Sequence, residues 1–464
     1  MKKVLLNSGV ALVSTMFLFT SCDKKETVIE KVAGSKEVII KSDITGTRTL
    51  VKDSTYILQG QVNVSGVINI AAGTVIKGDK VTKGSLIILP GGKINALGTA
   101  SMPIVFTSAL APGLRNAGDW GGLVIVGKAP VNQTTAVVEG LSREVAYGTS
   151  AIATRDAADN SGTLQYVRIE FAGISLQPDK EINGLTLCAV GSGTTIDHIQ
   201  VSYCGDDSFE WFGGNVNAKY LIAYLGLDDE FDTDYGYQGK VQFALGVRNP
   251  RQGDVSTSNG FESDNDGAGS AGLPQTAPVF SNVTLIGPYK TAADRNVSLN
   301  FGAGMHIRRN SSLSVFNSVF AGWNTGLLLD GTSTYGNATA GTLAIKNCAL
   351  VSSKITAVNG AGITATQALD FFNTTGFSNQ IIADNATAKI LSSFYDATKT
   401  GVAANPTSFL PEVGSPLLGA GAFATGSKVD NSFFDKTATY VGAFGATDWT
   451  KETWVNFDPQ NTVY

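Results

Sequence analysis

A repeat of fixed length between residues 199 and 234 constrains the fold of this chain more than any other feature. Residues 199–212 and 221–234 superimpose at a constant offset of 22 residues, which separates Phe209 from Phe231 and Asp206 from Asp228. Within each copy, apolar residues tend to alternate with polar ones, as in a β-strand. A period between about 20 and 50 residues with this alternation is typical of a solenoid whose units bury their apolar faces by stacking. The sequence therefore predicts a parallel β-helix.

Stacking turns each column of the repeat into a ladder of neighbouring side chains, because adjacent strands lie about 4.8 Å apart. The columns continue at residues 260–264, 305–308 and 327–330, although longer loops break the strict offset. Alternation predicts an inward ladder of Phe209, Phe231, Phe261, Met305 and Leu327. The first outward ladder is Glu210, Asp232, Glu262, His306 and Leu328, and the second is Phe212, Asp234, Asp264, Arg308 and Asp330.

Length and composition agree with one long stack. The 464 residues are 43% hydrophobic, which is enough to bury a large core, and a solenoid of this length counts as a single domain. The net charge of −5 and the absence of a basic stripe argue against a nucleic-acid partner. Only 16% of the residues are charged, and Thr, Ser, Asn and Gly are abundant. We therefore expect an extracellular all-β protein.

The amino terminus predicts the compartment. Two lysines follow Met1, residues 4–19 form an apolar stretch, and Thr20, Ser21 and Cys22 close it, in the manner of a secretory signal. The end of this stretch resembles a bacterial lipoprotein cleavage site, with Phe19 where leucine is usual. An ordinary signal peptide with a chance cysteine is the alternative. The resemblance implies that residues 1–21 are removed and that a lipid on Cys22 anchors the protein in the membrane without spanning it.

The remaining chain divides into three parts. Residues 22–41 are charged and show little core patterning, so we expect a tether. Residues 42–400 carry short β-branched strands between Gly and Pro, and are predicted to form the β-helix, with long loops at residues 127–159 and 239–280 that suit functional sites. Residues 401–464 lose the repeat and contain Trp449, Trp454 and Phe457, which suits a cap over the last open coil.

Several runs carry a resemblance to a known family. Residues 72–78, 91–100, 103–108 and 118–125 resemble the opening of a family of surface lipoproteins from the Bacteroidota, and residues 162–173, 181–187, 440–444 and 448–450 match the same family. That family is similar in architecture to pectate lyases. The resemblance implies a right-handed, single-stranded parallel β-helix and an outer-membrane location, and it implies no settled activity.

Two smaller patterns concern asparagine and cysteine. Asn282, Asn317 and Asn347 each precede a strand core, where stacked amides would bond along the ladder, with chance in an Asn-rich chain as the alternative.

If Cys22 carries lipid, three cysteines remain, at positions 188, 204 and 348. An odd number implies no disulfide framework, although a bridge between Cys188 and Cys204 stays open.

The outward ladders predict the chemistry of the surface. Carboxylates stacked one strand apart repel one another. The first alternative is Ca²⁺, which takes about six to eight oxygen ligands. The second is pairing with the cationic side chains one coil further on, and the third is a solvated acidic face. The candidate metal ligands are Asp232, Asp234, Glu262 and Asp264, and the candidate partners in the second alternative are His306, Arg308 and Arg309.

A second acidic group precedes these strands, at residues 206–207 and 228–230. Paired aspartates after glycine in a β-helix resemble part of a polygalacturonase site, whose hydrolysis uses paired carboxylates, but the other motifs of those enzymes are absent. Aspartate is also common at bends for its local hydrogen bonds. Pectate lyases use Ca²⁺ and an arginine base, and this resemblance implies Arg308 or Arg309 in the basic role.

The function we expect is binding at the bacterial cell surface, of a carbohydrate or of a polymer bridged by a cation. An accessory part in an outer-membrane complex also fits a lipid-anchored protein, whose partners would be the membrane, a glycan or a membrane protein. A Ca²⁺-dependent polyuronate lyase or a glycoside hydrolase is the alternative. Exposed aromatics, including Tyr237, would contact a sugar. The candidate ligand-binding residues are Glu210, Phe212, Tyr235, His306 and Arg308.

Overall fold

The structure is a computed structural model that describes residues 36–152, 154–175, 181–289, 294, 297–357, 362–390 and 408–464. The chain divides into two units, of which the second is Lys36–Tyr464. The predicted signal peptide, Cys22 and most of the predicted tether lie outside the described residues. Within the described part of the chain, none of the helices combines the length and apolar character that a membrane span needs.

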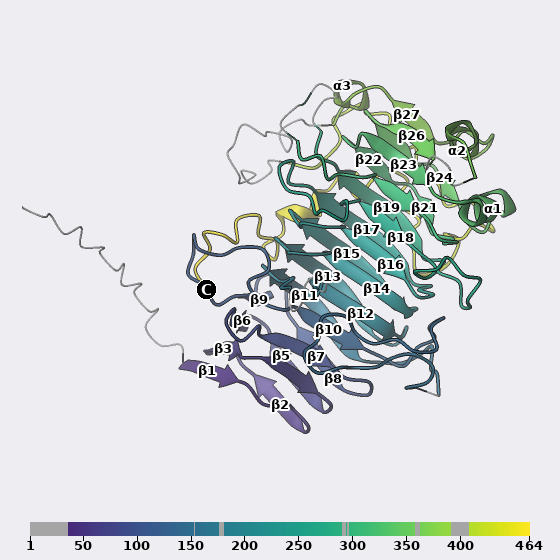
Figure 1. Cartoon of the computed structure of the whole chain (residues 1–464). Helices are drawn as coiled ribbons and strands as arrows, with labels where there is room; N and C mark the ends of the chain where they lie inside the picture. Colours follow the sequence, from purple (N-terminus) through teal and green to yellow (C-terminus); the bar gives the residue numbers. More distant parts are fainter. Residues whose placement is uncertain are drawn as a thin grey trace, which may run out of the picture. The chain divides into compact units, whose positions relative to one another are not determined.

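The second unit is a right-handed parallel β-helix, as predicted, and Figure 1 shows its strands stacked in chain order. One sheet, here the cleft sheet, contains β4 Gln61–Val64, β7 Ser85–Ile88, β10 Leu123–Val126, β12 Leu185–Val190, β14 Phe209–Gly214, β16 Phe231–Asp234, β18 Phe261–Ser263, β20 Met305–Ile307, β23 Thr325–Leu329 and β26 Lys354–Ala357.

The other sheet supplies the remaining strands of each coil. We call it the strap sheet, after the C-terminal segment that packs on it. It contains β1 Lys36–Ile40, β2 Thr47–Leu50, β3 Ser54–Leu58, β5 Val67–Ala71, β6 Val75–Gly78, β8 Lys93–Leu97, β9 Ile104–Ser108, β11 Gly162–Glu170, β13 Thr195–Ser202, β15 Asn217–Tyr224, β17 Lys240–Val247, β19 Val279–Ile286, β21 Ser314–Phe316, β22 Val319–Ala321, β24 Ile345–Lys346, β25 Ala349–Val351 and β27 Gln380–Ile382.

Strand β1 corrects the predicted start of the fold. Lys36–Ile40 pairs in parallel with β3, so the first coil begins inside the range expected to be a tether. The reason is visible in Val38 and Ile40, which contribute apolar side chains to the core despite the charges around them.

The register of the cleft sheet confirms the predicted inward ladder and the first outward ladder, and of the second outward ladder it contains the pair Phe212 and Asp234. Phe209 pairs with Phe231 and Phe231 with Phe261, with ring centroids 5.5 Å and 5.6 Å apart. All three rings are buried in the main core between the sheets, together with Met305 and Leu327. The residues paired along the outward ladder are Glu210, Asp232, Glu262, His306 and Leu328.

The long strands of the strap sheet bend at residues with positive φ. This column runs through Tyr166, His198, Tyr220 and Phe243 and continues as the three predicted asparagines. Asparagine tolerates the left-handed conformation because its short amide bonds locally. The aromatic members stack, with centroids 4.3 Å apart between Tyr166 and His198 and again between His198 and Tyr220.

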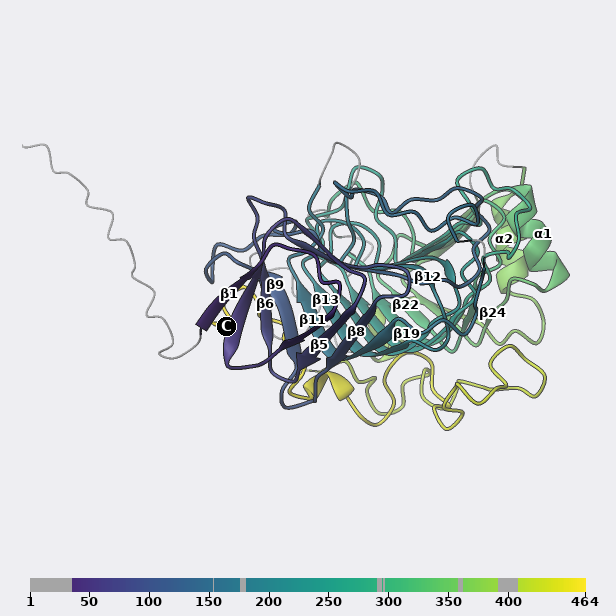
Figure 2. The same ribbon diagram turned by 90° about the horizontal axis from the view of Figure 1, so that it is seen from below.

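Residues 408–464, here called the strap, do not form the cap that we predicted. Trp449, Trp454 and Phe457 pack on the outer face of the strap sheet, in a cluster with Ile222 and Tyr224. Figure 2 shows this yellow segment running along the sheet. The outer face of the strap sheet is apolar at these positions. Burial of the strap's aromatic residues on this face therefore competes with the predicted position over the last coil.

The asparagine column binds the strap. Asn317 accepts a hydrogen bond from the Ala422 N–H at 2.8 Å and donates to the Ala422 carbonyl at 3.2 Å. Asn282 donates to the Tyr440 carbonyl at 2.9 Å, and Asn347 donates to the Ala420 carbonyl at 3.4 Å. The bonds predicted between stacked amides are thus replaced by bonds to the strap backbone.

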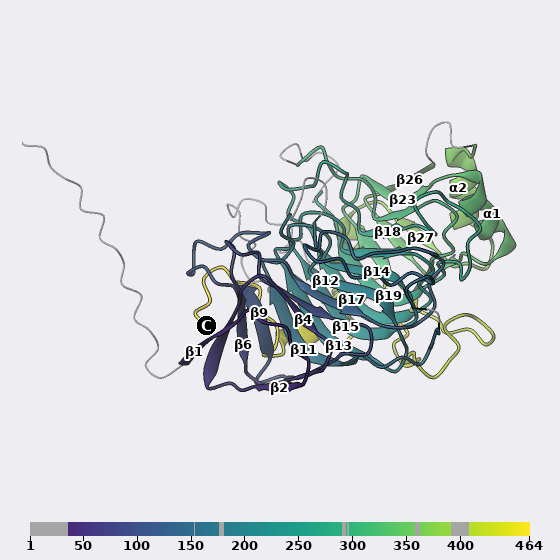
Figure 3. The same cartoon turned by 60° about the horizontal axis from the view of Figure 1, so that its bottom comes forward.

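Helices are few in the described chain, and its α-helices lie near the late strands. Figure 3 shows α1 Thr332–Ala340 and α2 Ala365–Phe372 beside β26 and β27. Helix α2 begins with a capping box at Thr364 and buries Ala368, Phe371 and Phe372 in the main core. The other helical turns are α3 Asn385–Ala388 and η2 Trp449–Lys451.

Candidate cation-binding cleft

Carboxylates from two adjacent columns meet in a cleft on the outer side of the cleft sheet. One column lies in the turn that precedes each strand, and the other is the first outward ladder. The cleft has a volume of about 230 Å³, and we call it the acidic cleft. Its lining residues are Glu139, Glu181, Asn183, Asp206, Asp207, Glu210, Asp228, Asp229, Asp232, Ser256, Thr257, Glu262 and Arg308.

The turn column is built by side chains that bind the backbone of the next coil. The Asp207 carboxylate accepts a hydrogen bond from the Asp229 N–H at 2.8 Å, and the Asp229 carboxylate accepts one from the Asn259 N–H. The Asn259 side-chain oxygen in turn accepts from the Ala303 N–H at 2.9 Å. The aspartates at this bend therefore bond between coils, where the sequence favoured local bonds, and they still face the cleft.

Three overlapping groups of carboxylates run along the cleft. In each group, one oxygen from every member lies within 4.8 Å of the others. Asp207 is shared by the first two groups and Asp232 by the last two. The groups are Asp206 with Asp207 and Asp228, then Asp207 with Glu210 and Asp232, then Asp229 with Asp232 and Glu262.

This crowding disfavours the charged forms of the carboxyls. Burial, followed by repulsion from neighbouring carboxylates, raises the pKa of Asp207, Glu210, Asp229 and Asp232 well above the usual values. One oxygen of Asp232 is buried without a hydrogen-bond partner. Asp207 and Asp229 are buried, which a fully solvated acidic face would not allow, so these carboxyls need either protons or a cation.

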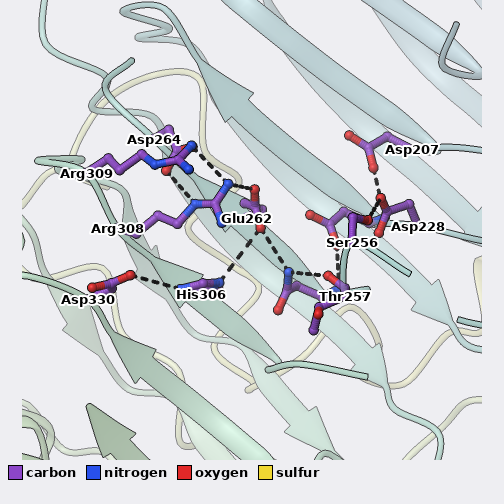
Figure 4. A network of polar contacts seen from close by, with 12 residues as sticks. Asp207, Asp228, Ser256, Thr257, Glu262, Asp264, His306, Arg308, Arg309 and Asp330 are labelled. Carbon is purple, nitrogen blue, oxygen red and sulfur yellow. Dashed lines mark hydrogen bonds and ion pairs between the residues drawn. The ribbon is translucent and has the colours of Figure 1, made fainter. Parts of the chain in front are cut away.

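The four predicted metal ligands do not stay together. Asp232 and Glu262 share a group with Asp229. The Asp264 carboxylate is instead held by Arg308 Nε at 2.8 Å and Arg309 Nη1 at 2.7 Å, as Figure 4 shows. Asp234 accepts a hydrogen bond from the Tyr235 N–H at 2.6 Å.

Two predicted ligand-binding residues pair with the end of this ladder. Arg308 bonds Glu262 as well as Asp264. Burial lowers the pKa of Arg308, but the Glu262 and Asp264 carboxylates outweigh it and raise that pKa overall. His306 lies between Glu262, with Nδ1 at 3.8 Å from Oε2, and Asp330, with Nε2 at 3.6 Å from Oδ2. Internal pairing thus accounts for Asp264 and part of Glu262, and among the described lining residues Arg308 is the only cationic side chain that the other carboxyls of the cleft could pair with.

The aromatic residues expected to be exposed are largely covered. Residues 127–159 fold over the cleft sheet, and Phe212 packs beneath them with Tyr147 and Tyr235, leaving Phe212 9% exposed. Tyr237 is fully buried, and its hydroxyl donates to the Val216 carbonyl at 2.8 Å. Tyr235 is half-buried. The expectation of a sugar platform is therefore wrong for Phe212 and Tyr237, because apolar loop residues bury this face.

A wider groove continues from the acidic cleft and shares Glu181, Asp206, Asp228 and Ser256 with it. Its volume is about 800 Å³. The remaining lining residues of the groove are Ala117, Gly118, Gly173, Ile174, Ser175, Gly205, Leu227, Asp254 and Val255. At Gly173 and Gly205, a Cβ atom would meet backbone atoms of the neighbouring turn within 2.5 Å. Glycine is required there, and the groove wall is bare backbone.

The cysteines form no bridge in the described chain. Cys188, Cys204 and Cys348 are free and buried, so the open alternative of a bridge between Cys188 and Cys204 is not realised.

Sequence reasoning placed the outward ladder correctly but gave the turn column no ligand role. The signal was the repeated Asp-Asp pair at 206–207 and 228–229, one turn ahead of Glu210 and Asp232. Asn183, which donates to Glu210, had no counterpart in the repeat.

A family model agrees with this fold. Residues 42–392 match the family model of the pectate-lyase like β-helix domain. A solved structure, the crystal structure of pectate lyase Pel9A, is similar at a TM-score of 0.33 and 14% identity, over 83% of this chain and 88% of that one. No curated protein matches the chain. The family model spans most of the sequence, so this chain belongs to the family of pectate-lyase like β-helix domains.

Proposed function

We propose that the acidic cleft binds a divalent hard cation, Ca²⁺, and through it an acidic polysaccharide. The observation that carries the proposal is the row of three carboxylate groups in which Asp232 keeps a buried oxygen without a partner. Ca²⁺ takes about six to eight oxygens at about 2.3 to 2.6 Å, and carboxylates are its preferred ligands in proteins. A cation also removes the repulsion that raises the carboxyl pKa values.

A polysaccharide ligand fits the surroundings of the cleft. Uronate carboxylates would complete the coordination of the cation, and the adjoining groove of about 800 Å³ offers room for sugar rings. Arg308 is the one cationic side chain among the described lining residues, and it stands beside His306 at the end of the ladder. These two residues would contact the anionic groups of the polysaccharide.

We further propose that the protein acts at the cell surface. A lipid on Cys22 would hold the β-helix on the bacterial outer membrane, alone or as an accessory of a membrane protein complex. Labelling of cells with a lipid precursor should mark the wild-type protein and should not mark Cys22→Ala. The variant should also be released from the membrane. Equal labelling of both proteins would contradict the anchor.

Catalysis is the second candidate, because the family takes its name from pectate lyases. A lyase needs a base near its operating pH, and the raised pKa of Arg308 makes it unsuited to that role. The raised carboxyl pKa values suit a general acid, which favours glycoside hydrolysis within this candidate.

Calorimetry with Ca²⁺ tests the cation site. Asp232→Asn should weaken binding by about 10-fold or more, since it removes a charge shared by two groups. Asp264→Asn is the matched control, because its oxygens are already held by two arginines, and its effect should be much smaller. Absence of Ca²⁺ binding by the wild type, or equal losses in the two variants, would refute the site.

Pull-down of the protein on polygalacturonate and alginate tests the polysaccharide. Retention should require Ca²⁺ and disappear with EDTA. The same mixtures are followed for unsaturated products and for new reducing ends. Turnover that is lost in Asp232→Asn would establish the catalytic candidate, and retention that is indifferent to EDTA would contradict bridging by a cation.

A further inference from the structure

A buried arginine lies behind the acidic cleft. Arg248 follows strand β17 and is 3% exposed, with its guanidinium 5.2 Å from the centre of the Phe301 ring. It faces residues 227–230, the bend between β15 and β16. This bend carries Asp228 and Asp229, which belong to different carboxylate groups of the cleft.

The guanidinium contacts three of the four residues of the bend. Nη2 donates to the Leu227 carbonyl at 2.8 Å, and Nη1 donates to the Asp228 carbonyl and to Glu230 Oε1, the latter at 3.0 Å. The fourth residue, Asp229, donates its N–H to the Asp207 carboxylate one coil away. The backbone of the bend is therefore fixed from both sides.

Only arginine has the donors for this arrangement. Its planar fork reaches two carbonyls and a carboxylate at once, whereas a lysine ammonium acts as a single point charge. Loss of the fork would leave the Asp228 carbonyl and the buried Glu230 carboxylate without this donor, while the Leu227 carbonyl would keep only the Ser258 hydroxyl at 2.8 Å. Acceptors left unpaired in this way are costly.

We propose that Arg248 is a positioning residue for the cation site. It holds the bend so that the side chains of Asp228 and Asp229 point into the cleft. Asp228 then joins the first carboxylate group and Asp229 joins the third. The inference rests on the proposed function, and adds to it a residue that touches neither the cation nor the polysaccharide.

A buried ion pair that only stabilises the fold is the competing explanation, and the chain supplies its own control. Arg168 and Glu170 form a second buried pair, with Nε 3.2 Å from Oε1, and Arg168 also donates to a backbone carbonyl, that of Trp454 at 3.3 Å. This pair belongs to the strap side, and neither residue lines the cleft. Arg168→Lys therefore repeats the chemical change away from the acidic bend.

The experiment uses Tb³⁺ as a luminescent stand-in for Ca²⁺ on the full chain. Lifetimes in H₂O and D₂O report how many waters remain on the ion. Arg248→Lys should add about one water and weaken Tb³⁺ binding about 10-fold, the usual size of a supporting-residue effect. Arg168→Lys should leave the water number and the affinity at wild-type values, even where its unfolding midpoint falls. Equal water numbers and affinities in the two variants would overturn the proposal.

Failure of the proposed function would be recognised separately, because the wild type would then bind neither Tb³⁺ nor Ca²⁺. In that event, hydrogen exchange in EDTA decides on Arg248. Protection of the Asp229 N–H should fall in Arg248→Lys and stay in Arg168→Lys, and unchanged protection would refute positioning. Should Arg248→Lys not fold, Phe301→Leu removes the ring beneath the guanidinium, and it should shift the same readouts in the same direction by a smaller amount.

Discussion

Replacement of Glu230 by glutamine should change how stability depends on pH. Glu230 is fully buried next to Arg248, and burial, only partly offset by that arginine, raises the pKa of Glu230 from 4.5 to about 7. Between these two values the folded protein holds a proton that the unfolded chain has released. Stability of the wild type therefore falls as pH rises through this window.

The size of the effect follows from the shift. A rise of the pKa from 4.5 to about 7 corresponds to about 3 kcal/mol, because each unit is worth about 1.4 kcal/mol. Glu230→Gln has no proton to lose there. The wild type should lose about 3 kcal/mol relative to the variant between acid pH and pH 8, with most of the change below neutrality.

Urea unfolding followed by tryptophan fluorescence measures this difference at several pH values. EDTA is present throughout, so that no cation masks the repulsion in the neighbouring cleft. Glu144→Gln, at an exposed position, is the control and should follow the wild type. A gap between wild type and Glu230→Gln that is constant across pH, or that moves in favour of the wild type at high pH, would refute the reasoning.

Three further predictions concern the stack, the strap and the covered aromatic residue. Phe231→Ala should cost about 3 to 5 kcal/mol in urea unfolding, since the ring is fully buried between Phe209 and Phe261; a loss below 1 kcal/mol would contradict the stacked core. Asn317→Ala should cost about 1 to 3 kcal/mol and expose the strap to limited proteolysis, because the Ala422 backbone loses its partner. Protease resistance equal to the wild type would speak against this attachment. Phe212→Ala should lower the unfolding midpoint without changing Ca²⁺ affinity, because Phe212 packs under the loop at residues 127–159. A loss of Ca²⁺ affinity at unchanged stability would show instead that Phe212 belongs to the binding site.

The ladder of paired residues could be predicted because its geometry is local in the repeat. An offset of 22 residues and a side-chain period of two leave one register in which Phe209 meets Phe231. That register carries Glu210 onto Asp232, and the same pattern around Phe261 carries Asp232 onto Glu262 across a longer loop. The predicted outward neighbours were therefore correct across five coils, despite loops of unequal length.

The partners of those carboxylates could not be predicted in the same way. Asp232 and Asp264 are equivalent in the pattern, yet Asp264 is paired with two arginines and Asp232 keeps a bare oxygen. The difference depends on side-chain rotamers of Arg308 and Arg309 and on the turn that brings Asp229 beside Asp232. Neither follows from alternation along a strand.

The sequence by itself determined that this chain stacks in parallel coils, which face of each strand is buried, and that acidic side chains form a column on the surface. Periodicity fixes these properties because each one depends on residues a single coil apart. Only the tertiary structure decided that the strap lies along a sheet, that a loop buries Phe212, and that Arg248 supports the acidic bend from behind. Those contacts join segments far apart in the chain, and their free energies depend on burial and orientation, which no local pattern encodes.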